Sequence, residues 1–202
     1  MDISKKGMND TLQYYNEHAA EFVQDTQNSD MHEKYEPFLS RVVLGGHILD
    51  LGCGSGRDSA EFIKRGYQVT AMDGSEQLCR IAEAYIGQQV HHMYFQDIGW
   101  QNAFDGVWAC ASLLHCTIAE LPEILQKVSD SLKDNGVLYI SFKYGDFAGW
   151  RNGRYFTNFT EDSLKALLET VPTLHLTQTS VTGDVRPGRQ NELWLNAIVE
   201  KR

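Results

Sequence analysis

The sequence feature that most constrains this chain is a glycine-rich turn between an apolar run and a helical pattern. Residues 47–58 read HILDLGCGSGRD, and a pattern typical of a helix continues to residue 64. Glycines lack Cβ atoms, so their backbone N–H groups can approach a ligand closely. A helix N-terminus directly after them favours negatively charged or hydroxyl-rich ligand groups. The stretch therefore predicts a strand, a tight turn, a helix, and a pocket for a nucleotide or nucleoside.

Length and composition fit one folded domain, residues 1–202, with 42% hydrophobic and 22% charged residues. The net charge of −9 argues against broad nucleic-acid binding, although it leaves room for a local basic pocket. No apolar run suggests a secretory signal or a membrane span. The four cysteines form no CxxC pair, so we expect no metal site and no disulfides, and a cytoplasmic setting; they are Cys53, Cys79, Cys110 and Cys116.

Two amphipathic helices are predicted before the first strand, at residues 9–25 and about 30–44. In the second, Asp30 and Glu33 resemble a capping box, and Gly45 and Gly46 would end the helix. Because both precede the alternating part of the chain, residues 1–46 are expected to form an N-terminal helical cap.

From residue 47 onward, strand and helix patterns alternate. Strands are predicted at 47–51, 67–72, 90–95, 104–110 and 137–142, and helices at 58–65, 75–86, 118–132 and 160–171. Residues 134–136 are expected to form a turn and 144–159 a loop. Two last strands, 174–182 and 192–200, are joined by a connection too short for a crossover helix, so they must form an antiparallel hairpin.

These elements predict an α/β fold with a doubly wound, Rossmann-like sheet in residues 47–202. The sheet has seven strands and is mostly parallel, with an antiparallel strand from the C-terminal hairpin. In such sheets ligands bind beyond the carboxyl ends of the strands, where the strand order reverses.

Three nucleotide motifs compete for the glycine turn. A P-loop needs Gly-Lys-Ser/Thr, which the chain lacks. A dinucleotide fingerprint needs GxGxxG, whereas here Gly56 comes one residue early and Arg57 stands in the place of the third glycine. The pattern Asp50-x-Gly52-x-Gly54-x-Gly56 resembles the nucleoside-binding motif of class I S-adenosylmethionine-dependent methyltransferases, including the type 11 and 12 groups. The run Gly52–Ser59 also resembles tellurite-resistance-type methyltransferases.

The resemblance implies a set of residues around S-adenosylmethionine and its product S-adenosylhomocysteine. Asp73, about 20 residues past the glycines, would bind the ribose, since a carboxylate can accept two hydrogen bonds from a diol. Asp97 and Ile98 would hold the adenine, and 111–115 resemble the family's fourth motif, beside the methyl donor. The implied cofactor-binding residues are Tyr15, Asp50, Gly52, Cys53, Gly54, Ser55, Gly56, Arg57, Asp73, Gly74, Ser75, Gln96, Asp97, Ile98, Ala111 and Ser112.

Structural roles stay open for several of these residues. Asp73 and Asp97 could be ordinary turn residues at strand ends. Cys53 could simply fill the turn, and Asp50 could serve only the backbone of the loop. Arg57 lies at a helix N-terminus, a poor place for a cation, so either a ligand carboxylate or a neighbouring acid should compensate its charge.

The acceptor side is predicted from scattered polar and aromatic residues. Methyl transfer is an in-line displacement, so a base is needed only if the acceptor loses a proton. Tyr15 lies in a segment that resembles the family's N-terminal helix over the donor, and His115 follows the fourth strand. Both are catalytic candidates, with a core tyrosine and a structural histidine as the alternatives. The candidate acceptor-binding residues are Tyr15, His115, Tyr144, Arg151, Arg154, Tyr155, Arg186, Arg189 and Trp194.

Four of these candidates are arginines in two loops of an acidic protein. Arginine forks bind planar anions, so these loops favour an anionic small acceptor if they fold to the same end of the sheet. Solvated loop arginines are the alternative.

The sequence therefore predicts a methyltransferase of a small molecule, without a metal, as a monomer or homodimer. One alternative is a transfer RNA or protein methyltransferase, since residues 189–194 loosely resemble the C-terminal segment of the enzymes that modify the wobble uridine. A second is a catalytically silent S-adenosylmethionine-binding module, and a third is a nicotinamide-dependent oxidoreductase.

Overall fold

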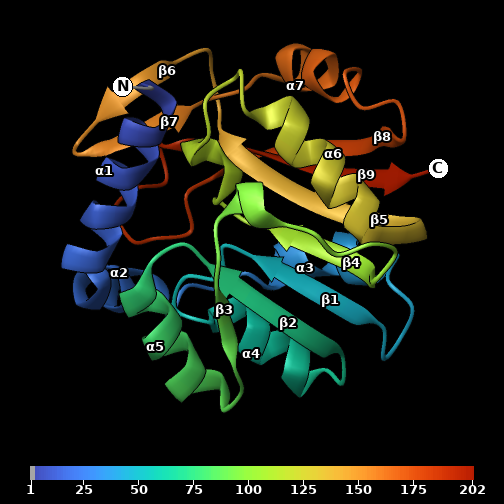
Figure 1. Cartoon of the computed structure of the whole chain (residues 1–202), viewed down its shortest axis with the longest axis horizontal. Helices are drawn as coiled ribbons and strands as arrows, with labels where there is room; N and C mark the ends of the chain where they lie inside the picture. The colour runs from blue at the N-terminus through green and yellow to red at the C-terminus, as the bar shows by residue number, and fades with distance from the viewer. Residues whose placement is uncertain (1–2) are drawn as a thin grey trace.

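A seven-stranded sheet forms the centre of the molecule (Figure 1). The computed structural model describes residues 3–202, with side chains from residue 10 onward. The strand order is β3-β2-β1-β4-β5-β9-β8. The strands are β1 (His47–Leu51), β2 (Gln68–Asp73), β3 (Val90–His92), β4 (Phe104–Ala109), β5 (Leu132–Lys143), β8 (Leu174–Gly183) and β9 (Leu193–Lys201). Strands β1 to β5 pair in parallel, and β9 runs antiparallel to both β5 and β8, which confirms the predicted fold.

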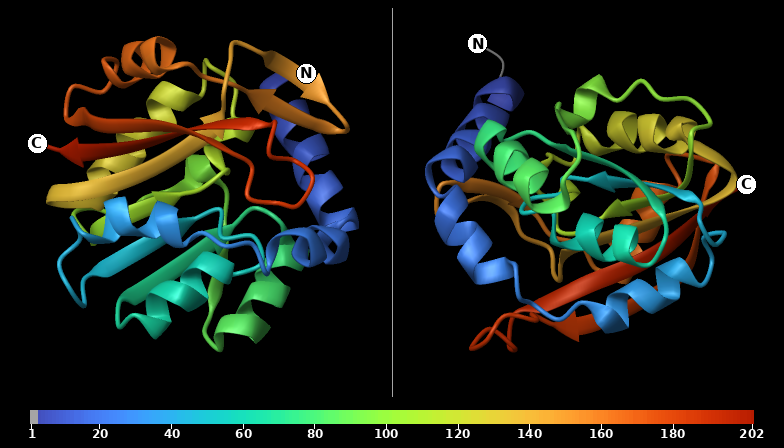
Figure 2. Two further views of the ribbon diagram at one scale, coloured as in Figure 1. Left: turned by 180° about the vertical axis from the view of Figure 1, so that it is seen from behind. Right: turned by 90° about the horizontal axis from the view of Figure 1, so that it is seen from below.

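Helices cover both faces of the sheet (Figure 2). One face is covered by α3 (His32–Leu39), α4 (Arg57–Lys64) and α5 (Glu76–Ile86), and the other by α6 (Leu121–Ser131) and α7 (Glu161–Leu168). Alternate residues of a strand point to opposite faces. In β1, Ile48 packs with Phe38 and Phe62 on the first face, while Leu49 and Leu51 pack on the second.

The order of the strands reverses between β1 and β4. From β1 the chain proceeds outward to β2 and β3, then returns to place β4 on the other side of β1 and proceeds to β5. Leu49 of β1 lies opposite both Thr70 of β2 and Val107 of β4. The glycine turn therefore lies at the carboxyl end of β1, next to the crevice where such sheets bind ligands.

The N-terminal cap differs from its prediction in two places. The predicted helix 9–25 is two helices, α1 (Ile3–Glu17) and α2 (Ala19–Thr26), because the chain breaks at His18, whose Nδ1 lies 2.9 Å from the carbonyl oxygen of Tyr14. The second helix is shorter than predicted and lacks the capping box; Asp30 instead accepts a hydrogen bond from the His32 N–H. It ends early because Val43 and Leu44 are exposed and find no core to support another turn.

Residues 144–159 are not the irregular loop that we predicted. They contain a two-stranded hairpin, β6 (Ala148–Arg151) and β7 (Arg154–Thr157), in which Arg151 pairs with Arg154. The two residues of its turn have positive φ angles, 50° at Asn152 and 76° at Gly153, as a type I′ turn requires. The hairpin lies beside α1 (Figure 1).

Several boundaries also differ from the prediction. Strand β5 starts at Leu132, and the predicted turn at 134–136 is a bulge within it, since Phe104 pairs with Leu132 and Gly106 with Val137. Strand β3 is short, and the 3-10 helix η1 (Phe95–Asp97) follows it; a second one, η2 (Leu113–His115), follows β4. Within residues 3–202, no helix has the length and apolarity needed to cross a membrane.

Candidate active site

The glycine turn is shaped by the space around it. All three glycines have φ in the left-handed region, between 55° and 81°. A Cβ atom at Gly52 would lie 2.5 Å from the Ser112 Cβ, and one at Gly56 would lie 3.0 Å from Ile86 of α5. The turn thus approaches the β4 loop on one side and α5 on the other, which only glycines permit.

Asp50 lies beneath this turn, with 2% of its surface exposed. Its Oδ2 accepts a hydrogen bond of 2.6 Å from the Ser59 hydroxyl, which ties the end of β1 to α4. Burial raises the pKa of Asp50 to about 8, and the nearby Asp58 contributes to the rise. Asp50 does not line the cavity described below, so its contacts in this structure are those of a support for the loop.

Arg57 is compensated by a neighbouring acid. Its Nε and Nη2 donate to Asp58 over 2.6 and 3.0 Å. Asp58 also accepts from the Tyr35 hydroxyl at 2.6 Å and from the Trp108 indole at 2.8 Å. Although burial opposes it, Arg57 and these donors hold the pKa of Asp58 below its ordinary value. We predicted that either a ligand carboxylate or a neighbouring acid compensates the charge of Arg57, and the structure contains the neighbouring acid.

Asp73 ends β2 and faces the cavity. Its Oδ2 accepts from the Gly54 N–H at 2.9 Å and its Oδ1 from the Ser75 N–H at 2.8 Å. Burial raises the pKa of Asp73, while those two backbone donors oppose the rise. The two backbone donors leave further lone pairs of the carboxyl group free to accept from a ligand. Ser75 itself serves as the N-cap of α5, where it accepts from the Leu78 N–H.

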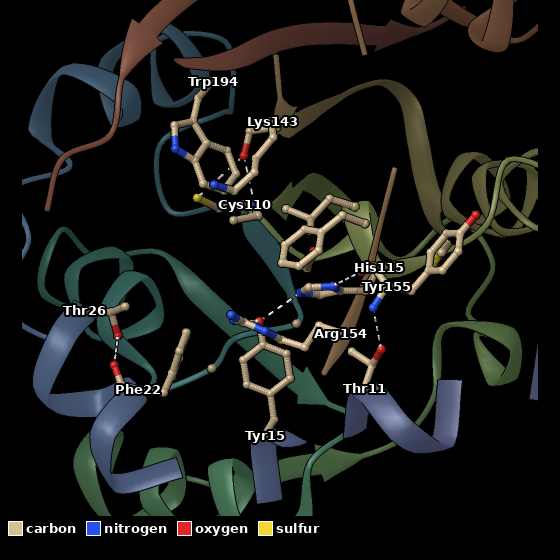
Figure 3. A pocket seen from close by; sticks show the side chains of 18 of the residues that line it. Thr11, Tyr15, Phe22, Thr26, Cys110, His115, Lys143, Arg154, Tyr155 and Trp194 are labelled. Carbon is tan, nitrogen blue, oxygen red and sulfur yellow. Dashed lines mark hydrogen bonds between the residues drawn. The ribbon is translucent and has the colours of Figure 1, made fainter. Parts of the chain in front are cut away.

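One cavity of about 770 Å³ joins the glycine turn to the loops that follow β5 and β8, at the same end of the sheet (Figure 3). Of the predicted cofactor-binding residues, eleven line it: Tyr15, Gly52, Cys53, Gly54, Ser55, Arg57, Asp73, Gly74, Gln96, Ala111 and Ser112. All predicted acceptor-side residues line it as well: His115, Tyr144, Arg151, Arg154, Tyr155, Arg186, Arg189 and Trp194. Segments far apart in the sequence thus meet around one space.

Five of the predicted cofactor-binding residues lie off the cavity wall: Asp50, Gly56, Ser75, Asp97 and Ile98. Asp97 is exposed, and the Ile98 side chain belongs to the core below the sheet. The wall next to them is made by residues 93–96 instead. There the Gln96 Oε1, and nearby the Ser112 Oγ, are buried without a hydrogen-bond partner among the described residues. A polar ligand in the cavity could satisfy both groups.

Tyr15, His115 and Arg154 form a cluster in the middle of the cavity (Figure 3). The Tyr15 hydroxyl lies 2.8 Å from His115 Nε2, and His115 Nδ1 lies 2.7 Å from the carbonyl oxygen of Tyr155. Burial lowers the pKa of His115 to about 4, and the charge of Arg154 adds to this. Burial also raises the pKa of Tyr15. At neutral pH this tyrosine and histidine are therefore both uncharged.

The four predicted arginines differ in their surroundings. Arg154 lies over the Tyr14 ring at 4.3 Å, has a buried Nε without a partner, and has none of the described carboxylates within 4.0 Å. Arg186 donates twice to Asp184, at 2.9 and 2.5 Å, and against the effect of burial these bonds hold the pKa of Asp184 low. Arg151 and Arg189 are exposed. Arg154 is thus the cation in this cluster that has no anion beside it.

Sequence reasoning missed several wall residues. Phe22 of α2 covers Gly54, where a Cβ atom would lie 3.0 Å from its ring. Lys143 ends β5, forms an ion pair with Glu192, and lies over the Trp194 ring. The rule that ligands meet the carboxyl ends of strands could have indicated Lys143. No local signal marks Phe22, since its role depends on how α2 folds back.

The fold and the cavity define a nucleoside-binding α/β protein, and comparisons with known proteins narrow this class. Residues 48–136 match the family model for a methyltransferase domain. An uncharacterized methyltransferase of Staphylococcus carnosus is 29% identical over 142 residues, which cover 66% of this chain and 69% of that protein. A ubiquinone biosynthesis O-methyltransferase of Idiomarina loihiensis is 26% identical over 55% of this chain, and the chain spans only 48% of that relative.

Among solved structures, the 1,6-didemethyltoxoflavin-N1-methyltransferase of Burkholderia thailandensis shares the fold. Its TM-score is 0.80 at 18% identity, and the match covers all of this chain and 91% of that one. The chain is thus similar to S-adenosylmethionine-dependent methyltransferases, in sequence over residues 48–136 and in fold over its whole length. These matches support an enzyme that takes its methyl group from S-adenosylmethionine. The cradle of glycines, the Asp73 carboxylate and the unpartnered Gln96 and Ser112 oxygens fit such a nucleoside.

Proposed function

We propose that this enzyme transfers the methyl group of S-adenosylmethionine to a small, anionic acceptor molecule. The donor would lie against the glycine turn, with its ribose on Asp73 and its adenine beside Gln96, near Asp97 and Ile98. The acceptor would lie beyond it, between the loops that carry Arg154 and Arg186. The observation that carries this proposal is the single cavity that joins the glycine turn to both arginine loops.

The chemistry of Arg154 supports an anion. Arg154 is half-buried and, among the described residues, its buried Nε has no partner and no carboxylate lies beside it, so part of its desolvation cost is not offset. A carboxylate, phosphate or enolate on the acceptor would offset that cost with charge-assisted hydrogen bonds. The names of two relatives support a small acceptor: one structure holds bound 1,6-didemethyltoxoflavin, and one curated relative acts in ubiquinone biosynthesis.

Three competing functions make different predictions. A transfer RNA or protein methyltransferase would label macromolecules rather than metabolites, and the net charge of −9 counts against transfer RNA. A silent binding module would bind the donor without producing S-adenosylhomocysteine. A nicotinamide-dependent oxidoreductase would bind NAD in calorimetry. The proposal includes a cytoplasmic setting and a monomer or homodimer, and the free state of all four cysteines agrees with a reducing compartment.

The test is to incubate the enzyme with radiolabelled S-adenosylmethionine and a pool of small metabolites, identify the product, and then measure variants with that acceptor. Arg154→Ala should raise the KM for the acceptor about 10- to 100-fold, because charged hydrogen bonds contribute about 1.5–3 kcal/mol. Arg186→Ala should raise it less, since Asp184 already holds that guanidinium. In both variants the affinity for S-adenosylmethionine should stay within about threefold of the original.

Asp73→Asn is the reciprocal control. It removes the charge beside the proposed ribose site, so donor affinity should fall about tenfold or more while the KM for the acceptor changes little. An unchanged KM for the acceptor in both arginine variants would contradict the anionic acceptor. Label that enters only protein or RNA would contradict the small-molecule proposal as a whole.

A further inference from the structure

The hydrogen bonds around His115 fix where its proton lies. A carbonyl oxygen can only accept, so the 2.7 Å contact with Tyr155 requires the proton on His115 Nδ1. The neutral ring then presents a lone pair on Nε2. The Tyr15 hydroxyl, 2.8 Å away, must therefore donate its proton to Nε2. The Tyr15 oxygen also accepts from Arg154 Nη1, 3.4 Å away, which leaves one lone pair of the hydroxyl oxygen to accept from a further group.

The further group would come from the cavity. Tyr15 lies on its wall together with Cys53, Gly54 and Asp73 on the donor side, and with His115 and Arg154 on the acceptor side. Figure 3 shows the Tyr15 hydroxyl pointing toward His115 and Arg154, so the proposed donor and acceptor would meet beside it. The chain of contacts continues from Tyr15 through the imidazole to the β7 backbone, so the ring cannot rotate without losing a bond at each end.

We propose that Tyr15 and His115 form a proton relay, and that the acceptor is therefore methylated at a protic O–H or N–H group. This inference rests on the methyltransferase function proposed above and names the class of its acceptor atom. A thiolate, a halide or the lone pair of a metalloid loses no proton when it is methylated and would need no such relay.

The relay is balanced in atoms and charge. S-adenosylmethionine supplies the methyl group: its S–CH₃ bond breaks, the electron pair stays on sulfur, and the acceptor oxygen or nitrogen bonds to the methyl carbon. The acceptor proton moves to the Tyr15 oxygen, and the Tyr15 proton moves to His115 Nε2. The imidazole gains the single positive charge that the donor loses, so the net charge of the closed site does not change. The imidazolium later returns its proton to water through Tyr15.

Charged and titratable groups around Tyr15 and His115 determine how strong a base the imidazole is. They are Arg154 of β7, Asp73 at the end of β2, and Tyr14 of α1. Arg154 opposes a second positive charge on the imidazole. An anionic group of the acceptor seated on Arg154 would cancel that effect and make His115 a stronger base. Anion binding and proton removal are thereby coupled, which favours acceptors that carry both an anion and a protic group.

The first test needs no acceptor. Nitrogen NMR of histidine-labelled enzyme should show His115 neutral, with its proton on Nδ1, from about pH 5.5 to 8. Tyr15→Phe should change the Nε2 shift and preserve that tautomer. A His115 that carries its proton on Nε2 would contradict the relay, because Nε2 could not then accept from Tyr15.

The second test measures kcat against pH with the acceptor found in the metabolite assay. At pH 7, Tyr15→Phe and His115→Gln should lower kcat about 100-fold or more, the usual contribution of proton transfer. The loss should shrink as pH rises, because a growing share of the acceptor is ionised before it binds. Calorimetry with S-adenosylhomocysteine should give an affinity within about threefold of the original for His115→Gln.

Matched controls are Tyr85→Phe and His175→Gln, two exposed residues outside the cavity, which should leave kcat unchanged. A loss of kcat that is equal at every pH, or a product methylated on sulfur or on an aprotic atom, would overturn the relay while the methyltransferase function stands. Binding of S-adenosylhomocysteine without any product from the pool would instead remove the proposed function, and the relay with it.

Discussion

Asp50 and Asp73 are two buried aspartates next to the glycine turn, and they differ in their hydrogen-bond partners and therefore in their roles. Asp73 accepts from two backbone N–H groups, and its carboxyl group faces the cavity. Asp50 has one hydroxyl donor, Ser59, and lies with a second buried carboxyl group, Asp58, nearby. Burial raises the pKa of both. Among the described residues, the Asp50 carboxyl group accepts only one hydrogen bond, from a neutral hydroxyl, so the protein does little to stabilise its charged form.

This makes Asp50 a source of pH-dependent stability. Its pKa is about 8 in the folded protein, against about 3.9 in an unfolded chain. Between these values the folded state binds the extra proton, so the contribution of Asp50 is complete below about pH 4 and is lost as pH rises toward 8. Asp50→Asn keeps an acceptor for Ser59 and removes the titration. It should raise the melting temperature by about 2–4 °C at pH 8 and by less at pH 5, measured by calorimetry.

Asp105 provides a control, because its pKa shift and its effect on pH-dependent stability have the opposite sign to those of Asp50. It accepts from the His47 N–H and from Lys133, which hold its pKa below the ordinary value against the effect of burial. Its stabilising contribution is therefore present above about pH 4 and is lost below it. Asp105→Asn should lower the melting temperature at neutral pH. A lower melting temperature for Asp50→Asn at pH 8 would contradict the assignment.

At the scale of single residues, the sequence predicted what depends on local geometry. Alternating glycines and an acid at the end of the next strand have fixed positions in this fold, so Gly52, Gly54 and Asp73 could be found from spacing. The contacts of Asp58 with Tyr35 and Trp108 could not, because they join segments 23 and 50 residues away. Spacing along the chain carries no information about such pairs.

Among the elements, α1 and the β6–β7 hairpin close one side of the cavity together. The Tyr155 N–H donates to the Thr11 hydroxyl at 3.1 Å, and Arg154 packs over Tyr14. The turn residue Gly153 lies so close that a Cβ atom would be 3.1 Å from the Tyr14 ring. This pairing of a helix with a hairpin places Tyr15 and Arg154 on the same wall.

Thr11→Val tests how far this contact holds α1 in place. Valine keeps the shape of threonine and removes the acceptor, so the Tyr155 N–H is left without its partner, at a cost of about 1 kcal/mol. Hydrogen exchange of that amide and of the α1 amides should become at least several-fold faster. Thr170→Val, whose hydroxyl donates to a carbonyl within its own turn, should not affect α1. Unchanged exchange at Tyr155 would show that α1 is held by its other contacts.

Element by element, the alternating part of the chain was predictable because each strand and helix carries its own hydrophobic period. The hairpin was missed although Asn152-Gly153 is a strong signal for a two-residue turn, since the flanking strands are only four residues long. The break between α1 and α2 was missed because the apolar spacing continues through His18. The bulge in β5 resembles a turn in sequence, since Asn135 has the positive φ that turns also use.

Over the whole molecule, the proposed donor and acceptor sides are assembled in different ways. Most of the proposed donor side comes from consecutive loops between residues 50 and 112, and the matched methyltransferase family model covers this stretch. The acceptor side combines α1, the hairpin, and the segment between β8 and β9. Segments that meet only after folding carry no common sequence motif, which is why the sequence predicts the methyl donor and leaves the acceptor to be found by experiment.

A ligand that binds across these parts should stabilise all of them at once. S-adenosylhomocysteine at about 100 times its Kd should add about 2.7 kcal/mol, which for a chain of this size raises the melting temperature by about 5–11 °C. NAD at the same concentration should change it by less than about 1 °C, because Arg57 takes the place of the third glycine of a dinucleotide site and is bound to Asp58. A larger shift with NAD would contradict the donor site described for this turn, whereas a selective shift with S-adenosylhomocysteine would show that the glycine turn binds a single nucleoside.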